Sequence, residues 1–149
     1  MVRNNLSKML DFSIVFWKKI ASYNITEIRM RTDRGIGINR VDKEYRFPPY
    51  SDAYYEYKER KGRRASPPDF SFRSLTMKDL KEIYTTKNFT EIGWRGEFAD
   101  IVLYHEEKKK YQVAGISDKQ MNEILKRVDK EVQRNWDKKV KDQTILIKS

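Results

Sequence analysis

The chain has 149 residues and a formal net charge of +10, with 36% charged residues, no cysteine and a single histidine. This length predicts one domain (residues 1–149) with one hydrophobic core. The lack of cysteine excludes disulfide frameworks and thiolate metal sites, and one histidine excludes zinc motifs that need two. No apolar run approaches the about 18 residues of a membrane span, and residues 12–17 lack the context of a secretory signal. A reducing cytoplasm, or a particle assembled in one, is the expected location.

The positive charge is spread along the chain. Residues 1–26, 27–64 and 95–149 each carry an excess of cations, whereas residues 65–94 are neutral. Nucleic acid, an acidic protein surface or an anionic membrane would each be attracted by such a field, and a solvated surface of mixed charge is the plain alternative.

The first predicted element is an apolar helix over residues 5–22. Its apolar side chains follow i, i+3, i+4 spacing, and further apolar residues cover much of the circumference. A helix of this kind is buried on more than one face, either deep in a core or against a neighbouring subunit; a membrane surface is the weaker alternative. The subunit-interface candidates are Phe12, Val15, Phe16 and Trp17.

Short elements and a basic loop are predicted next. Thr26 caps a short helix that runs to Arg31, residues 36–47 form a small hairpin, and Ser51 or Asp52 caps a helix of about ten residues that Gly62 ends. Residues 61–69 form a flexible basic loop. The cations in and beside this loop are candidates for contact with a partner or with DNA: Arg60, Lys61, Arg63 and Arg64.

The second half of the chain alternates short strands and helices. We expect a weak strand over 70–75, a helical stretch over 76–83, a hairpin of 83–86 with 90–94 that turns at Lys87–Asn88, and a helix over 97–110. An extended segment over 111–116 follows, and a last strand covers 145–147. The fold class predicted from these elements is α+β, a small antiparallel β-sheet packed with long N-terminal and C-terminal helices.

The most distinct helix signal is the pair Ser117 and Gln120. This spacing is a capping box, and it predicts a helix that ends near Lys139. One stripe of apolar residues along this helix is expected to be buried: Met121, Ile124, Leu125, Val128, Val132 and Trp136.

Catalytic motifs are incomplete. His105-Glu106 starts like a metalloprotease helix motif, but Lys109 stands where the second histidine belongs. Asp100, Glu106 and Lys108 resemble the carboxylate and lysine set of a metal-dependent nuclease, yet Asp100 and Glu106 lie about 120° apart on one helix. We therefore predict no catalytic, metal or cofactor site. A small nuclease, or a basic nucleic-acid-binding module whose tyrosines (residues 45–57) stack on bases, remains the alternative.

Seven short motifs occur in an order that resembles one protein family. They are RTDRGIGINR (31–40), FPPYS (47–51), KERKGR (58–63), PPDFSF (67–72), TMKDLKEI (76–83), TEIGW with ADIVLYH (90–105) and VAGISDKQMNEIL (113–125). Together they are similar to the virion-morphogenesis or tail-completion proteins of tailed phages, the neck proteins that join tail to head. The chain departs from that pattern at Met77 and at Glu106-Glu107-Lys108, where the family has glycines.

The resemblance implies a non-enzymatic structural subunit of the head–tail connector. It implies a homo-oligomeric ring, a hexamer first and a dodecamer second, with genomic DNA passing through the lumen without sequence specificity. Connector or adaptor proteins and the tail terminator or tail tube are the implied partners. The protein would act in the virion after assembly in the cytoplasm of the host bacterium, with no membrane partner.

Overall fold

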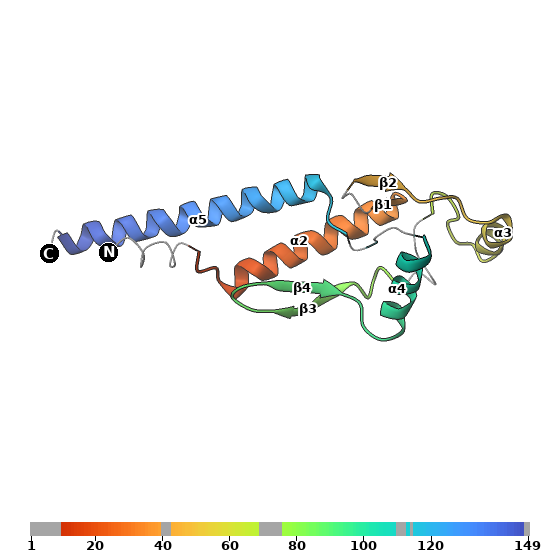
Figure 1. Ribbon diagram of the computed structural model, residues 1–149, viewed down its shortest axis with the longest axis horizontal. Coiled ribbons are helices and arrows are strands. Elements are labelled where there is room, and N and C mark those ends of the chain that lie inside the picture. Colours follow the sequence, from red (N-terminus) through yellow and green to blue (C-terminus); the bar gives the residue numbers. More distant parts are fainter. Residues whose placement is uncertain (1–9, 40–42, 69–75, 110–112, 114, 148–149) are drawn as a thin grey trace.

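The fold is α+β and elongated. A computed structural model describes residues 10–39, 43–68, 76–109, 113 and 115–147, the side chains of 109 and 141–147 excepted. In these ranges the chain forms four helices and two antiparallel two-stranded sheets, so the predicted fold class is confirmed. Helix α3 stands at one end of the molecule, and the C-terminal end of helix α5 stands at the other (Figure 1). Within the same ranges, no helix is long and apolar enough to cross a membrane.

Helix α2 (Ile14–Asp33) replaces two of the predicted helices. It begins after Ser13, whose hydroxyl oxygen accepts a hydrogen bond from the Phe16 backbone N–H at 3.1 Å. The expected start at residue 5 is therefore wrong for residues 10–13, and residues 5–9 lie outside the described residues. Thr26 starts no new helix, because its hydroxyl donates to the Ser22 carbonyl oxygen within the same helix at 2.9 Å.

The first hairpin follows α2 directly and confirms the prediction for residues 36–47. Strand β1 (Ile36–Ile38) pairs with β2 (Glu44–Arg46), with Gly37 opposite Tyr45. Gly35 joins α2 to β1 at a φ of 75°, where glycine carries no steric penalty, and its carbonyl accepts from the Phe47 N–H at 2.8 Å. The hairpin is thus fixed to the C-terminal end of α2.

Helix α3 (Asp52–Arg60) confirms the predicted tyrosine-rich helix. The Ser51 carbonyl accepts from the N–H groups of Tyr54 and Tyr55, both at 2.9 Å, and Gly62 follows the helix at a φ of 63°. The weak strand predicted over 70–75 lies outside the described residues.

The prediction of a helix over residues 76–83 is wrong. Residues 76–80 form a turn, and strand β3 (Lys81–Thr85) pairs with β4 (Thr90–Gly93) in the second predicted hairpin. The Arg29 guanidinium donates to the carbonyl oxygens of Met77, Lys78 and Leu80 at 2.9, 3.0 and 2.7 Å. Since those carbonyls bond to α2, they are not available for a helix of their own.

Helices α4 (Glu97–Lys109) and α5 (Asp118–Ile147) complete the chain. Helix α4 matches the prediction, whereas α5 passes the expected end near Lys139 and takes in the expected strand over 145–147. Neither glycine nor proline occurs between Asp118 and Ile147, so no residue there stops a helix.

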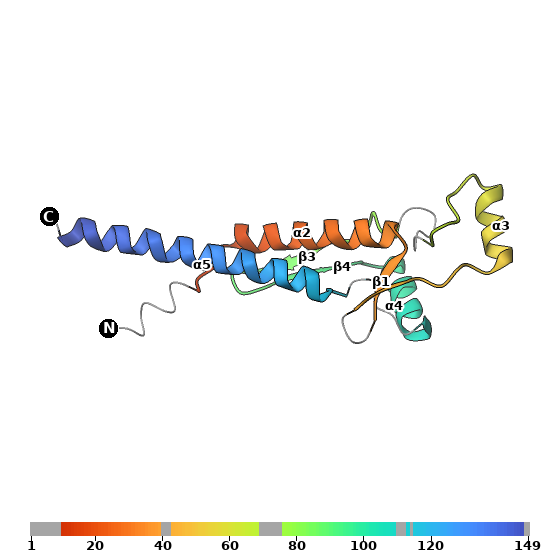
Figure 2. The same ribbon diagram turned by 90° about the horizontal axis from the view of Figure 1, so that it is seen from above.

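Two small clusters form the core. One joins Phe16 and Ile20 of α2 to Ile124 of α5, and the other joins Phe47, Val102 and Val113. Both clusters lie beside α2, which runs between α5 and the β3–β4 hairpin (Figure 1). Figure 2 shows that α5 runs along α2 and then projects past its first turn.

A buried arginine attaches the start of α5 to the end of α2. Arg31 is 6% exposed, and its guanidinium donates to Gln120 Oε1 at 2.6 Å and to the carbonyl oxygens of Val113 and Gly115 at 2.8 and 3.0 Å. Burial lowers the pKa of Arg31 to about 10, against the opposite effect of Glu44 and Glu27, so the group stays cationic at neutral pH.

Gln120 is also the second member of the predicted capping box, which is confirmed. Its Oε1 accepts from the Ser117 N–H at 3.1 Å, and its own N–H donates to Ser117 Oγ at 3.3 Å. The Gln120 side chain therefore caps the start of α5 and also offsets part of the free-energy cost of burying the Arg31 cation.

Gln120→Ala is expected to lower the free energy of unfolding by about 2 kcal/mol, because it removes the cap and one partner of a buried cation. Urea unfolding followed by circular dichroism measures this. Gln133→Ala is the matched control, since Gln133 is exposed and bonds only to Asp137 at 2.8 Å; it should change stability by no more than about 0.5 kcal/mol. Equal effects of the two substitutions would contradict the role given to Gln120.

Candidate assembly surfaces

The predicted interface residues of the first helix divide between core and surface. Phe16 is only 7% exposed and belongs to the core, whereas Val15 is 62% exposed. Phe12 and Trp17 are half-buried and contact Phe16, with ring centroids 4.9 and 5.5 Å from that of Phe16. The Trp17 indole N–H donates to the Lys87 carbonyl oxygen at 2.7 Å, which attaches this end of α2 to the β3–β4 turn. Of the four candidates, Val15 has the most free surface for a neighbour.

Two apolar neighbours extend the surface that Val15 presents. Leu10 and Ile14 are both exposed and lie beside the first turn of α2. We call Leu10, Ile14 and Val15 the α2 patch. Neither residue is among the interface candidates that the sequence predicts, and Leu10 lies before α2 instead of within a helix.

The apolar side of α5 is wider than the surface that the rest of the described chain buries. Ile124 is buried and Val128 is half-buried against α2, but Leu125 is 51% exposed and Trp136 is 44% exposed. The expectation of one buried stripe is therefore wrong for several of its members. Sequence periodicity finds the apolar side but not how much of it the chain itself covers. We call the exposed apolar residues of this helix the α5 face: Met121, Leu125, Trp136 and Val140.

The geometry of the two helices explains this exposure. Helix α5 has 30 residues and is about 45 Å long, and it runs antiparallel to α2 (Figures 1 and 2). Contacts between them run from Arg31 with Gln120 to Phe12 and Val128 in one core cluster. The distal part of α5 projects past the first turn of α2 (Figure 2), whereas Met121 and Leu125 precede Val128 and are exposed because α2 packs on the side of Ile124 and Val128.

The basic loop is placed at the opposite end of the molecule, beside α3. Arg60 and Lys61 are exposed, and Arg63 is half-buried. Arg64 donates to the backbone carbonyl of Asp33 and forms an ion pair with its carboxylate at 3.3 Å, which joins the loop to the end of α2. Since Arg64 and Asp33 are both well exposed, this ion pair adds little stability. The flexibility expected for residues 61–69 stays a prediction.

A buried lysine supports the same end. Lys58 is 2% exposed; its Nζ lies 3.3 Å from the Tyr50 hydroxyl oxygen and 4.7 Å from the centre of that ring. The Lys58 carbonyl accepts from the Arg63 N–H at 2.9 Å. The tyrosines nearest to Lys58 therefore act in packing, and Tyr55 and Tyr57 are the exposed ones of this helix.

The residues of the nuclease alternative lie on α4. Glu106 Oε1 accepts from the Val113 backbone N–H at 2.8 Å, so this carboxylate has a structural partner. Asp100 is exposed about one and two-thirds turns earlier, about 120° away around the helix. Among the residues that the structure describes, no group of three or more His, Cys, Asp or Glu side chains is arranged to hold a metal ion.

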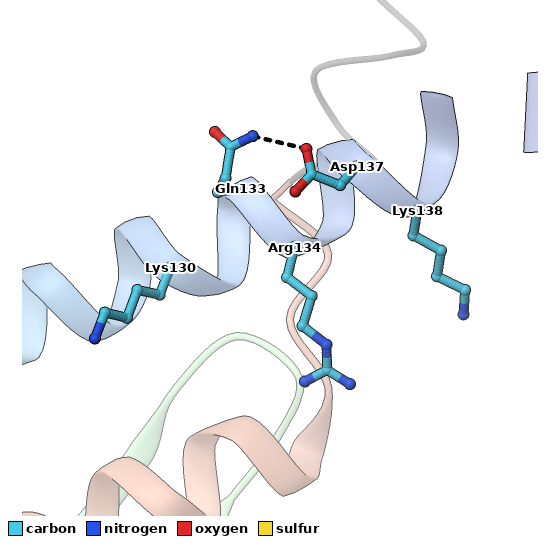
Figure 3. Close-up of a pocket in the computed structure, with 5 residues that line it drawn as sticks. All are labelled: Lys130, Gln133, Arg134, Asp137 and Lys138. Carbon is cyan, nitrogen blue, oxygen red and sulfur yellow. Dashed lines mark hydrogen bonds between the residues drawn. The ribbon is translucent and has the colours of Figure 1, made fainter. Parts of the chain in front are cut away.

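An open pocket of about 540 Å³ lies along the distal part of α5. Its lining residues are Lys130, Gln133, Arg134, Asp137 and Lys138 (Figure 3). Gln133 Nε2 donates to Asp137 Oδ1 at 2.8 Å, so the one carboxylate of the pocket is already engaged. The remaining lining groups are cations.

No protein-family model, curated protein or solved structure matches this chain.

Incubation of the purified protein with plasmid DNA or RNA and Mg²⁺ or Mn²⁺ is expected to give no cleavage above that of a mock purification, because Glu106 is engaged by the backbone. Gel electrophoresis measures this. Cleavage that disappears in both Asp100→Ala and Glu106→Ala would contradict this expectation and establish the nuclease alternative.

Proposed function

We propose that the chain is a structural subunit of the head–tail connector, or neck, of a tailed phage, and that it forms a ring joining tail to head around the DNA channel. The observation that carries this proposal is the α5 face, four exposed apolar residues on a helix whose distal part projects from the body (Figure 1). Exposed apolar surface of this kind is typical of protein–protein contact. The seven motifs, whose order resembles that of neck proteins, support the same function.

The chain offers two different apolar surfaces for self-association. The α5 face lies on the projecting helix, and the α2 patch lies where that helix leaves the body (Figure 1). When two different surfaces of identical subunits meet, the contact is heterologous, and it closes into a ring if the rotation between subunits allows. We propose that the α5 face of one subunit covers the α2 patch of the next, in a hexamer or, second, a dodecamer.

The basic loop then points away from this contact. Because α3 and the loop stand at the far end of the molecule, they are free to meet a neighbouring component, either the connector or adaptor proteins on one side or the tail terminator or tube on the other. Arg60, Lys61, Arg63 and Arg64 carry four positive charges within five positions. Such a cluster favours an acidic counterpart, and its contribution decreases as salt rises.

Leu125→Glu with Trp136→Glu tests the proposed subunit contact. Both side chains are exposed and glutamate favours helix, so the variant should fold. Burying two carboxylates should reduce incorporation into phage particles at least about tenfold. Quantitative immunoblots of purified particles measure incorporation.

Leu103→Glu with Tyr104→Glu is the matched control, because both residues are equally exposed apolar positions on α4. This variant should be incorporated like the wild type. Normal incorporation of the α5 variant would contradict the proposed contact.

Replacement of Arg60, Lys61, Arg63 and Arg64 by glutamate tests the basic loop. These positions are exposed or half-buried, so the change should alter fold stability by less than about 1 kcal/mol. Reversed charge should prevent docking onto an acidic partner, and we expect a folded protein that does not join heads to tails. Electron microscopy of lysates, with counts of free heads and tails, measures this; normal yields of complete particles would show that the cluster is only a solvated surface.

A further inference from the structure

The four residues of the α5 face are spaced symmetrically along the helix. Met121 and Leu125 are four residues apart, Trp136 and Val140 are also four residues apart, and eleven positions separate Leu125 from Trp136. At about 100° per residue, all four fall within about 100° around the helix axis, so they form one stripe. The order of spacings along this stripe is therefore the same in both directions.

A stripe with this symmetry is complementary to a reversed copy of itself. When two α5 helices run antiparallel with Leu125 level with Trp136 of the partner subunit, Met121 is level with Val140 of the partner subunit. The two-fold axis of such a pair repeats each of these contacts. Each contact joins a larger apolar side chain to a smaller one, whereas a parallel pair in register would set Trp136 level with Trp136 of the partner subunit.

The charged residues beside the stripe match in the same register. Lys126 follows Leu125 and Asp137 follows Trp136, so each lies about 100° around the helix from an inner apolar residue. In the antiparallel pair these two positions come to the same side of the contact, about 3 Å apart along the axis. Lys126 also pairs with Glu123 at 2.6 Å, but that ion pair is exposed and therefore weak. Opposite charges thus meet across the contact.

We infer that the α5 face binds the α5 face of a second copy of this chain, antiparallel and with Leu125 level with Trp136 of the partner subunit. The overlap from Met121 to Val140 covers about 29 Å of helix. Near its middle, the exposed Asp129 lies about 4.5 Å along the axis from Asp129 of the partner subunit, and these like charges repel. The pair is therefore reversible.

This pairing goes beyond the proposed ring, in which the α5 face covers the α2 patch of the next subunit. One face cannot make both contacts at once, so subunits that are paired through α5 cannot close a ring until they separate. This consequence rests on the proposed function, whereas the pairing itself concerns the free chain and does not. Paired subunits would be held out of rings until a stronger contact at the neck displaces the pair.

The mass of the purified chain in solution tests the pairing. Sedimentation over the micromolar range should show a dimer for the wild type and a monomer for Leu125→Glu with Trp136→Glu, because the contact would bury four carboxylates. Leu103→Glu with Tyr104→Glu is the matched control on α4 and should stay dimeric. Circular dichroism confirms that both variants are folded. A monomeric wild type, or a dimer that persists in the α5 variant, would overturn the inference, as would a larger closed ring of the free wild type.

Single cysteines test the register, because the chain has no cysteine of its own. Met121→Cys and Val140→Cys are purified separately, mixed and oxidised, and the mixture should form a disulfide between the two variants. Neither variant alone should do so, because two copies of the same position lie about 29 Å apart along the axis. Gel electrophoresis without reductant measures the cross-link, and Leu103→Cys mixed with either variant gives the background. A mixture at background, or equal cross-linking of each variant alone, would overturn the antiparallel register.

These outcomes are separate from failure of the proposed function. A chain that pairs through α5 but is missing from phage particles would disprove the connector role and leave the pairing established. A chain that is found in particles but is monomeric in solution would disprove the pairing and leave the connector role standing.

Discussion

The buried Arg31 guanidinium sets the direction of α5, and the exposed surfaces of the protein follow from that direction. It bonds to Gln120 Oε1 and to the carbonyl oxygens of Val113 and Gly115, so it holds the last residues before α5 and the first turn of that helix against the end of α2. These three bonds offset part of the cost of burying the cation, while Arg31 Nε is buried with no hydrogen-bond partner in the part of the chain that the structure describes. Because the contact lies at the first turn, any change there would move the far end of α5 by many ångströms.

The length of α5 then determines what is exposed. The two helices run antiparallel, and the distal part of α5 projects past the first turn of α2 (Figure 2). The core contains few large side chains, so part of the apolar side of α5 stays exposed and can contact another molecule. The opposite side of the helix carries charged residues. The α5 face is thus a consequence of this geometry, a long helix that is attached at its first turn and projects past α2.

Local signals in the sequence predicted the elements whose contacts are local. The capping box of Ser117 and Gln120, both hairpins and α3 depend on residues within a few positions of one another, and each is where the sequence places it. The segment over 76–83 reads as helical on its own, yet Arg29 binds three of its carbonyl oxygens from 48 to 51 residues away. A contact across such a distance in the chain has no signature in the segment itself.

The surfaces were predicted less well than the elements, for a related reason. Periodicity shows that Leu125 and Trp136 belong to an apolar side of a helix, but only the position of α2 decides which of these residues it covers. The cations beside Gly62 were found because they are consecutive.

Imaging of the phage neck is the most direct test of the proposal that this chain forms a ring at the head–tail junction. Averaging of electron micrographs of particles that contain a labelled copy of this chain would give its copy number and symmetry at the head–tail junction. The proposed function predicts a closed ring of identical subunits around the DNA, with α5 at the contact between neighbours. A single copy without rotational symmetry, or a label found anywhere other than the neck, would contradict it.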